Sequence, residues 1–282
     1  MSLAEMAAAR GLHRVGARPP LWSYLKQTWQ RRDFAIAMAR FKIRSHNERN
    51  RLGMLWVVLQ PSLNALVYGV IFGVLQGGRR PEKFLEFVVI GVFLFQFFTS
   101  SMNSGAKSIT GNRALVQSLA FPRLTLPLSV VIEQALTLVP TLGVMVGVLL
   151  VRGTWPSWEW LLLVPLLCLY ALFTTGVALI GARLTVHIRD LTQLLPFVSR
   201  VLFYTSGVLF QPDRILQNYP SVLALYDWHP LHEVLSIARG LLLPTADYNP
   251  MYWAYFAVWS VVVFVFGLIF FWVAEERYGR AD

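Results

Sequence analysis

Cysteine is nearly absent from this sequence of 282 residues, since Cys168 is the only one. A single cysteine excludes a disulfide framework and a cysteine metal site within one chain. Charged residues are also scarce, at 14% of the chain, whereas hydrophobic residues make up 56%. This composition is too apolar for an ordinary soluble domain and is typical of an integral membrane protein.

Motifs of nucleotide and metal chemistry are also missing. The fragment nearest to the phosphate-binding loop G-x-x-x-x-G-K-[ST] is NSGAKS at 103–108, and its residues do not match. We therefore expect no cofactor on this chain, and ATP and Mg²⁺ to be bound by a partner. The best material for a metal site is Asp227, His229, His232 and Glu233, but HPLHE lacks the H-E-x-x-H spacing that places two imidazoles one helical turn apart. Ordinary histidines at a membrane surface are favoured, with no metal ligand and no catalytic residue.

Long runs without charge predict membrane spans. Each is near or above the roughly 18 apolar residues that cross a bilayer core, and they lie at 54–78, 87–106, 134–151, 160–182 and 248–274. A weaker run at 191–210 contains Arg200 and Pro196, interruptions that neighbouring helices can accommodate. The sequence therefore predicts an all-α integral membrane protein with six transmembrane helices.

The distribution of basic residues predicts the orientation. Residues 1–53 contain eleven of the 25 Lys and Arg residues. With this end inside, the inner loops and the C-terminal end raise the inner total to eighteen, against six outside. Because Lys and Arg accumulate in short cytoplasmic segments, we expect a multi-pass protein of the cytoplasmic membrane with both termini inside. The first fifty residues contain no apolar core of signal-peptide length, so we expect the first span to act as its own anchor.

Residues 1–53 are predicted to form a basic, amphipathic segment on the inner membrane surface. Trp22, Leu25 and Trp29 share one helical face, and Phe34, Met38 and Phe41 share another. This pattern indicates two short helices with their apolar sides towards lipid. Their cations form a collar for anionic lipid headgroups, which comprises Arg31, Arg32, Arg40, Lys42 and Arg44. The alternative is a basic tail that binds nucleic acid, and aromatic residues at helical spacing beside a span argue against it.

The segment 211–250, between the fifth and sixth spans, is neither a loop nor a span. Its stretch HPLHEVLSIARGLLLP has apolar runs too short to cross a bilayer, bounded by prolines and surrounded by Tyr and Trp. Since these aromatic residues prefer the membrane interface, we expect a re-entrant helical hairpin that dips into the outer leaflet. Its candidate functional residues are Trp228, His229 and Arg239.

Few ionisable groups lie within the spans, and each is a functional candidate because it is costly to bury there. If the third span enters from the inside near Leu124 and the fifth near Leu191, Glu133 and Arg200 both lie nine positions into their spans. This is about 13 Å deep at 1.5 Å per residue, so they can meet. A transport role and a purely structural ion pair both remain open.

Polar and aromatic residues of the spans could line a path for sugars, with rings against pyranose C–H faces and polar side chains against hydroxyls. The candidates are Trp56, Gln60, Asn64, Tyr68, Gln96, Thr99, Phe203 and Tyr204. Ordinary packing or lipid contact is the alternative for the aromatic residues.

Four fragments resemble those of a known family. NRALVQSLAFPRLTLPLS at 112–129 is similar to a cytoplasmic signature N-x-x-L-V-x-x-x-x-F-P-R-x-x-x-P-L and is the most specific match. LGMLWVVLQP at 52–61 resembles the start of the family's first span, and RDLTQLLPF at 189–197 resembles its R-D-x-x-x-x-x-P segment. HPLHEVLSIARGLLL at 229–243 resembles its N-P-L…R segment, with His229 where asparagine is usual, and His46 and Asn47 stand where an Arg-Tyr pair is common. The family is that of the ABC-2 type permeases of polysaccharide export, the membrane subunits of O-antigen, teichoic acid, capsule and galactan transporters.

The resemblance implies a homodimer of six-span subunits, with two copies of a separate ATPase subunit, that exports a polyprenyl-diphosphate-linked glycan. Residues 54–276 would form the ABC-2 transmembrane domain and 277–282 a cytoplasmic tail. The basic collar would suit a diphosphate, and the outer hairpin would line the exit. Residues 112–123 would be the coupling helix, and the expected ATPase-coupling residues are Asn112, Arg113, Leu115, Val116, Phe121, Pro122, Arg123, Arg189 and Asp190.

The chain is thus expected to be a transport subunit and not an enzyme. The N-terminus is rich in Ala and Arg, which is typical of a GC-rich genome. This favours a lipid-linked galactan of an actinobacterial cell wall as the cargo. Two alternatives remain: an ABC-2 exporter of a drug or lipid, and an integral-membrane enzyme that modifies glycans.

Overall fold

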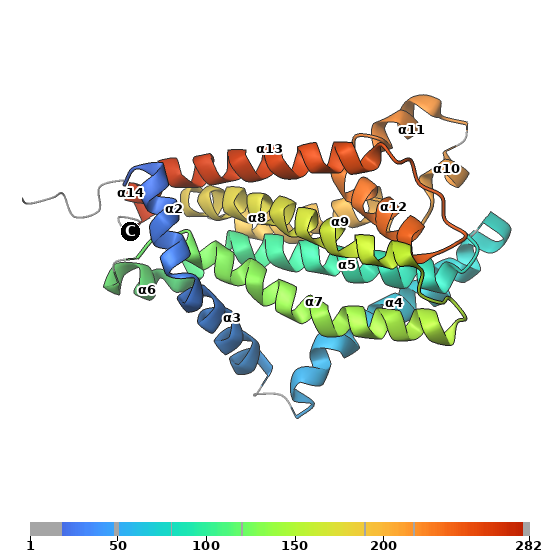
Figure 1. Ribbon diagram of the computed structural model, residues 1–282, viewed down its shortest axis with the longest axis horizontal. Helices are drawn as coiled ribbons and strands as arrows, with labels where there is room; N and C mark the ends of the chain where they lie inside the picture. The colour runs from blue at the N-terminus through green and yellow to red at the C-terminus, as the bar shows by residue number, and fades with distance from the viewer. Residues whose placement is uncertain are drawn as a thin grey trace, which may run out of the picture.

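A computed structural model describes residues 19–47, 51–79, 81–119, 121–188, 190–216 and 218–278, and these residues form helices without any strand (Figure 1). Five of the helices are long and apolar enough to cross a membrane. They are η1 with α4 (Gly53–Gln76), α5 (Phe84–Ala106), α7 (Thr125–Val151), η4 with α8 (Trp158–His187) and α13 (Tyr252–Val273). The predicted all-α membrane fold is therefore confirmed.

The third span begins close to Leu124, the entry point that the depth of Glu133 assumed, and well before the charge-free run of this span. α7 starts at Thr125, nine residues before the charge-free run that begins at Gln134. Glu133 interrupts the run of uncharged residues, but a single carboxyl side chain does not interrupt the backbone hydrogen bonds of a helix. The charge criterion therefore located the span but not its inner end.

The predicted fifth span is represented by a shorter helix, α9 (Leu191–Thr205), of 15 residues. At 1.5 Å per residue it is about 22 Å long, less than the roughly 30 Å of a bilayer core. Buried, non-helical residues from Ser206 to Leu209 follow it. α9 takes the chain from the end of the molecule that holds α6 to the end that holds α11 (Figure 1). A sixth crossing at this position stays a prediction.

α5 is the central helix of the fold. It contacts α4, α7, α8, α9 and α12, and 78% of its most apolar window is buried. In the core, the Phe97 ring packs edge-on against Tyr170 with centroids 5.4 Å apart, and Tyr170 packs against Phe256 at 6.1 Å. The buried Tyr170 hydroxyl donates to the carbonyl of Leu94 (3.1 Å), so the polar end of this side chain is satisfied inside the apolar core. The corresponding windows of α4, α7 and α13 are only 11% to 22% buried, as expected for helices that face lipid or a partner.

α8 and α13 touch through their backbones. A Cβ atom on Gly176 would lie 2.5 Å from the carbonyl oxygen of Val263, and one on Gly267 would lie 2.5 Å from that of Gly176. Small residues permit this approach of two helices within a membrane, where close packing replaces the hydrophobic effect as the main attraction. These two glycines hold α8 and α13 together as one tightly packed pair.

Short helices gather at the two ends of the long ones (Figure 1). One end holds α2 (Leu21–Gln30), α6 (Arg113–Ser118) after η3 (Thr110–Asn112), and α14 (Glu275–Tyr278), and α3 (Arg32–Asn47) slopes away from it. The other end holds α10 (Pro212–Ile215), α11 (Pro220–Tyr226) and α12 (Pro230–Leu242), while η2 (Gly77–Arg79) follows α4. The two predicted N-terminal helices are present and break at Arg31, whereas their location on a membrane surface stays a prediction. Residues 1–18 and 279–282 lie outside the described chain.

Candidate functional site

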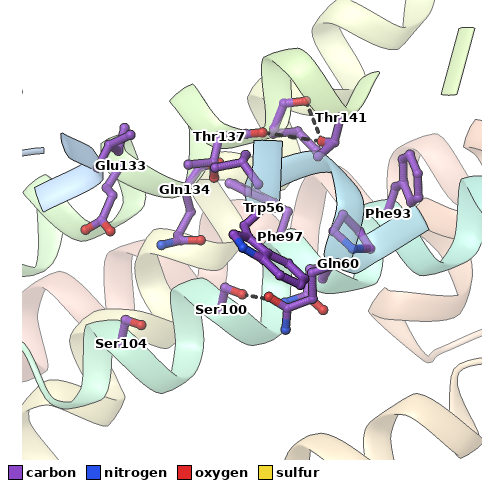
Figure 2. A pocket seen from close by; sticks show the side chains of 15 residues that line it. Trp56, Gln60, Phe93, Phe97, Ser100, Ser104, Glu133, Gln134, Thr137 and Thr141 are labelled. Atoms are coloured by element: carbon purple, nitrogen blue, oxygen red, sulfur yellow. Dashed lines mark hydrogen bonds between the residues drawn. The ribbon is translucent and has the colours of Figure 1, made fainter. Parts of the chain in front are cut away.

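A cleft of about 440 Å³ opens between α3, α4, α5 and α7 (Figure 2). It combines aromatic rings, amides, hydroxyls and one carboxyl group. The lining residues are Ile43 of α3; Trp56, Val57, Gln60 and Pro61 of α4; Phe93, Gln96, Phe97, Ser100 and Ser104 of α5; and Glu133, Gln134, Thr137, Leu138 and Thr141 of α7.

The polar groups of the cleft are partly arranged by hydrogen bonds within the helices. The Gln96 Nε2 donates to Ser100 Oγ (2.9 Å), and the Thr137 hydroxyl donates to the carbonyl of Gln134 (2.8 Å). These side chains keep oxygen lone pairs that can accept further hydrogen bonds. In Figure 2 the Trp56 indole lies between Gln134 and Gln60. The cleft therefore presents a ring face beside hydrogen-bonding groups, the combination that an amphipathic ligand such as a sugar requires.

Three of the predicted path residues, Trp56, Gln60 and Gln96, line this cleft. The polar residues of α7 were missed, although Gln134, Thr137 and Thr141 recur at three- and four-residue intervals on one helical face. This spacing is the signal by which the sequence indicates them.

The other predicted path residues lie elsewhere. The Phe203 ring packs between Tyr68 and Phe95, with centroids 5.1 and 5.2 Å away, so this aromatic group belongs to the packing between helices. The Thr99 hydroxyl donates to the carbonyl of Phe95 (3.1 Å). Asn64 is half-buried and Tyr204 is exposed, and neither lines the cleft.

Glu133 and Arg200 are not brought together in this conformation. Glu133 lines the cleft, whereas Arg200 is exposed on α9, and none of the ion pairs among the described residues joins them. Lys42 of α3 is the cation whose charge interacts with Glu133: burial lowers the pKa of Lys42, and the Glu133 carboxylate opposes that shift. Pairing of Glu133 with Arg200 in another transport state stays a prediction. The other collar residues, Arg31, Arg32, Arg40 and Arg44, are exposed, whereas Lys42 is half-buried.

A buried polar junction ties three distant segments together at the end that holds α2 and α14. The Tyr24 hydroxyl donates to Glu275 Oε2 (2.6 Å) and accepts from the Leu124 N–H (3.0 Å). The Arg123 N–H donates to Glu275 Oε1 (3.1 Å), and its guanidinium donates to the Glu275 carbonyl (2.9 Å). Burial raises the pKa of Glu275, while the hydrogen bonds from Tyr24 and Arg123 act in the opposite direction. We call these four residues the Tyr24–Glu275 junction.

The predicted coupling segment is helical only over Arg113–Ser118 and is extended at Leu119. Val116 was expected to fill a pocket of an ATPase, but it is 4% exposed and packs in a cluster with Ile109 and Leu179. That expectation is therefore wrong for Val116, because its helical position faces the chain's own core. Leu115 also packs against this cluster, whereas Leu119 is 54% exposed and is the large apolar side chain available to a partner.

The remaining predicted coupling residues have structural contacts. The Asn112 side chain donates to the carbonyl of Ser108 (2.7 Å), and Pro122 is buried. The Phe121 ring packs in a tilted arrangement against Phe34 of α3, with centroids 5.7 Å apart. Arg113 and Asp190 are exposed. Arg189 lies outside the described residues.

Arg239 was named as a candidate residue of the outer hairpin, and the structure gives it a buried position in α12. Its guanidinium is buried and donates to the carbonyls of Phe87 (3.3 Å), Gly207 (2.9 Å) and Val208 (2.7 Å), and it also stacks 3.4 Å over the Phe87 ring. Burial lowers its pKa to about 9. Arg239 therefore joins α12 to α5 and to the turn after α9, a structural role that satisfies its five donors in part by backbone carbonyls.

The other two candidates of the outer hairpin, Trp228 and His229, lie between α11 and α12. Trp228 is exposed and stacks on Tyr255 with centroids 5.3 Å apart. His229 Nδ1 accepts from the N–H of His232 (3.3 Å), so His229 caps the first turn of α12.

Comparison with protein families matches residues 35–243 to the ABC-2 type transporter family. The chain belongs to the ABC-2 type transporter family. The match runs from α3 to the residue after α12 and includes the cleft and the coupling segment, whereas Tyr24 and Glu275 lie outside it.

Three proteins with known names are similar to this chain over most of its length. The O-antigen export system permease protein RfbA of Klebsiella pneumoniae is 28% identical over 250 residues, which cover 88% of this chain and 94% of the relative. A protein of the same name from Myxococcus xanthus is 28% identical, covering 79% of this chain and 86% of the relative. The polysialic acid transport protein KpsM of Escherichia coli is 27% identical, covering 83% of this chain and 91% of the relative.

Proposed function

We propose that this chain is the membrane subunit of an exporter that moves a polyprenyl-diphosphate-linked polysaccharide across the cytoplasmic membrane, driven by a separate ATPase subunit. The observation that carries the proposal is the cleft in which Trp56 and Phe97 lie beside Gln60, Gln96 and Gln134. The names of the relatives, which concern O-antigen and polysialic acid, support a polymer of sugars as the cargo.

The charges near the cleft support a diphosphate-linked substrate. Lys42 is half-buried on α3 near Glu133, and Arg40 and Arg44 of the same helix are exposed. Cations beside a path with ring faces and amides suit a ligand that has a phosphate at one end and hydroxyls along its length. In this proposal α3 receives the diphosphate and the cleft receives the first sugars.

The ATPase is proposed to dock at the groove of about 700 Å³ between α2 and the coupling segment. Gln27, Arg31, Gln117 and Leu119 are among its lining residues, and Arg123 links this groove to the Tyr24–Glu275 junction. Leu119→Asp is expected to abolish co-purification with the ATPase, because it would place a charge in an apolar contact. Ala114→Asp is the comparison variant within α6, since Ala114 is exposed and does not line this groove. Equal retention of the ATPase by both variants would contradict the proposed docking.

A homodimer is proposed through the face of α9 that includes Arg200. This face also exposes Phe197, Val201 and Tyr204. An arginine among apolar residues at membrane depth is costly against lipid and therefore favours a face that meets a partner copy or a water-filled path.

Reactivity of single cysteines tests the proposed orientation. In a Cys168→Ser background, Trp155→Cys and Asn218→Cys should react with an impermeant thiol reagent in whole cells, and Ser45→Cys should not. All three positions are exposed, whereas Thr154, next to Trp155, is 2% exposed and receives a hydrogen bond from Lys83. Labelling of Ser45→Cys, without labelling of the other two variants, would contradict the proposed orientation and indicate the opposite one.

Depletion of the protein is the experiment that tests the cargo. A lipid-linked glycan should accumulate on the inner face of the membrane, and the wild-type gene should clear it. Trp56→Ala should fail to clear it although the protein is inserted and ATPase-bound, whereas Trp158→Ala, at an exposed tryptophan outside the cleft, should succeed. Accumulation of a drug or simple lipid would favour the other ABC-2 class, and glycan modification by the purified chain without an ATPase would favour an enzyme.

A further inference from the structure

A second depression, with a volume of about 790 Å³, lies under α2 and shares no lining residue with the cleft. One wall comes from α2 and the start of α3. The other comes from α7, α8 and α13, through residues such as Leu128, Ile132, Leu179 and Leu268. We call it the α2 groove.

The interior of the α2 groove suits an apolar occupant. Its two threonines have already used their hydroxyl hydrogens, since Thr28 donates to the carbonyl of Tyr24 (2.9 Å) and Thr125 donates to that of Pro122 (2.6 Å). The walls of α7, α8 and α13 otherwise present Leu, Ile and Phe side chains. A polar ligand would lose its hydrogen bonds with water there without gaining hydrogen-bond donors from the groove. An alkyl chain has no such hydrogen bonds to lose, and its burial is favourable.

The rim of the groove differs from its interior. Lys26 and Arg32 are exposed along it, together with the indoles of Trp22 and Trp29, which are 81% and 68% exposed. The Arg32 guanidinium lies 5.1 Å from the Trp29 ring centroid, and its contact with the exposed Asp33 is long, at 4.0 Å. Cations and indoles beside an apolar slot match the phosphate, glycerol and acyl regions of an anionic phospholipid.

Hydrogen bonds to the rest of the chain fix the position of α2 beside the groove. The Tyr24 hydroxyl is bonded to Glu275 and Leu124, and the Trp272 indole donates to the carbonyl of Pro19 (3.0 Å). These bonds fix α2 against the chain at Pro19 and Tyr24. The groove-lining Trp22 lies between these two points, and Lys26 lies two residues after Tyr24. The helix is therefore not free to close the groove by settling onto the spans.

We propose that the α2 groove binds one anionic glycerophospholipid, with an acyl chain against α7, α8 and α13 and its phosphate at Lys26 and Arg32. This site is separate from the proposed glycan path and does not depend on it. The bound lipid would complete the apolar surface under α2 and so support the helix that carries Tyr24.

Native mass spectrometry of the delipidated full chain in detergent tests the proposal, with dioleoyl-phosphatidylglycerol and dioleoyl-phosphatidylcholine titrated separately. One phosphatidylglycerol should remain bound at a concentration that leaves phosphatidylcholine largely unbound. Lys26→Gln/Arg32→Gln should weaken phosphatidylglycerol binding by roughly tenfold or more, since each cation near a membrane surface favours an anionic lipid. Lys107→Gln/Arg113→Gln, an equal loss of charge at exposed positions outside the groove, should change it little.

A second variant separates the acyl chain from the headgroup. Ile132→Trp, which fills the groove, should weaken the binding of both lipids, and unchanged binding would overturn the proposed position of the chain. Equal effects of the two charge variants would overturn the headgroup site. If Trp22→Cys in a Cys168→Ser background forms a disulfide between two copies in membranes, the groove is an interface between copies and the lipid proposal is wrong.

Discussion

Replacement of Tyr24 by phenylalanine removes one hydroxyl group from the centre of the Tyr24–Glu275 junction. That hydroxyl makes a 2.6 Å hydrogen bond to the Glu275 carboxylate and accepts a 3.0 Å hydrogen bond from the Leu124 N–H. A hydrogen bond to a charged group contributes about 1.5–3 kcal/mol, and a buried N–H left without a partner costs about 1–3 kcal/mol. Since the two effects share one site and are not additive, we expect Tyr24→Phe to lower stability by about 2–4 kcal/mol.

Tyr278→Phe is the matched control, because Tyr278 is also buried in the apolar cluster around the junction. Its hydroxyl makes a single neutral hydrogen bond, to the carbonyl of Phe271 (3.0 Å). Its loss should cost about 1 kcal/mol. The two substitutions remove the same atom from the same residue type, so a difference between them reports the junction and not the deletion of a hydroxyl.

The measurement is the midpoint of thermal unfolding in lipid nanodiscs, at one fixed heating rate because membrane proteins commonly unfold irreversibly. The midpoint of Tyr24→Phe should fall by roughly 4–16 °C, and that of Tyr278→Phe by about 2–4 °C, if each kcal/mol shifts the midpoint as in soluble domains of similar size. Glu275→Gln combined with Tyr24→Phe should be less destabilising than the sum of the two single changes. An equal loss for the two tyrosine variants would refute the reasoning.

Three further outcomes are expected. Gly91→Ala should destabilise the protein and loosen α12, because the added Cβ would meet Arg239 Nη2 and would lie 3.0 Å from the Val208 carbonyl oxygen. A Cβ added at Gly143 would face open space, so Gly143→Ala should be neutral or slightly stabilising in the same thermal assay. Glu233 is fully buried, and this burial, with a smaller contribution from the Asp227 charge, raises the pKa of its carboxyl group from 4.5 to about 8. The folded state therefore holds this proton more tightly than the unfolded state does. Stability should decline as the pH rises from about 4.5 to about 8. Glu233→Gln should abolish that decline and exceed the wild type in thermal midpoint at pH 9 but not at pH 5, and parallel pH curves would contradict the shift. Glu133→Gln should reduce glycan export at unchanged protein level, since Glu133 lines the cleft, while an unaffected rate of export would remove this carboxyl group from the path.

The parts of the fold that follow from local pattern were predictable. Charge-free runs located five spans, and the aromatic spacing of residues 21–45 anticipated α2 and α3 with their break at Arg31. These features depend on solvation and helical periodicity, which operate within a few turns of chain. Trp56 and Gln60 were predicted to line a sugar path because aromatic rings and polar side chains together suit a sugar, and both line the cleft.

Side-chain direction was the main source of error. Arg239 and Val116 were assigned to outer and inner surfaces by their place in the topology, but Arg239 is held by three carbonyls and Val116 packs inwards. Neither direction follows from the local sequence, because each depends on which neighbouring helix lies against that face. Tyr24 and Glu275 could not have been paired at all, since they are 251 residues apart and neither stands in a motif.

The Tyr24–Glu275 contact also determines when the N-terminal helix reaches its final position during synthesis. Tyr24 is made near the beginning of translation and its acceptor only 251 residues later. At about 5–20 residues per second, the ribosome needs roughly 10–50 seconds to supply that acceptor. Throughout this interval the Tyr24 hydroxyl lacks its Glu275 acceptor, so α2 cannot complete this contact until the spans have been synthesised. Docking of α2 is therefore a completion step, and a chain that stops before α14 leaves its first helix unfastened.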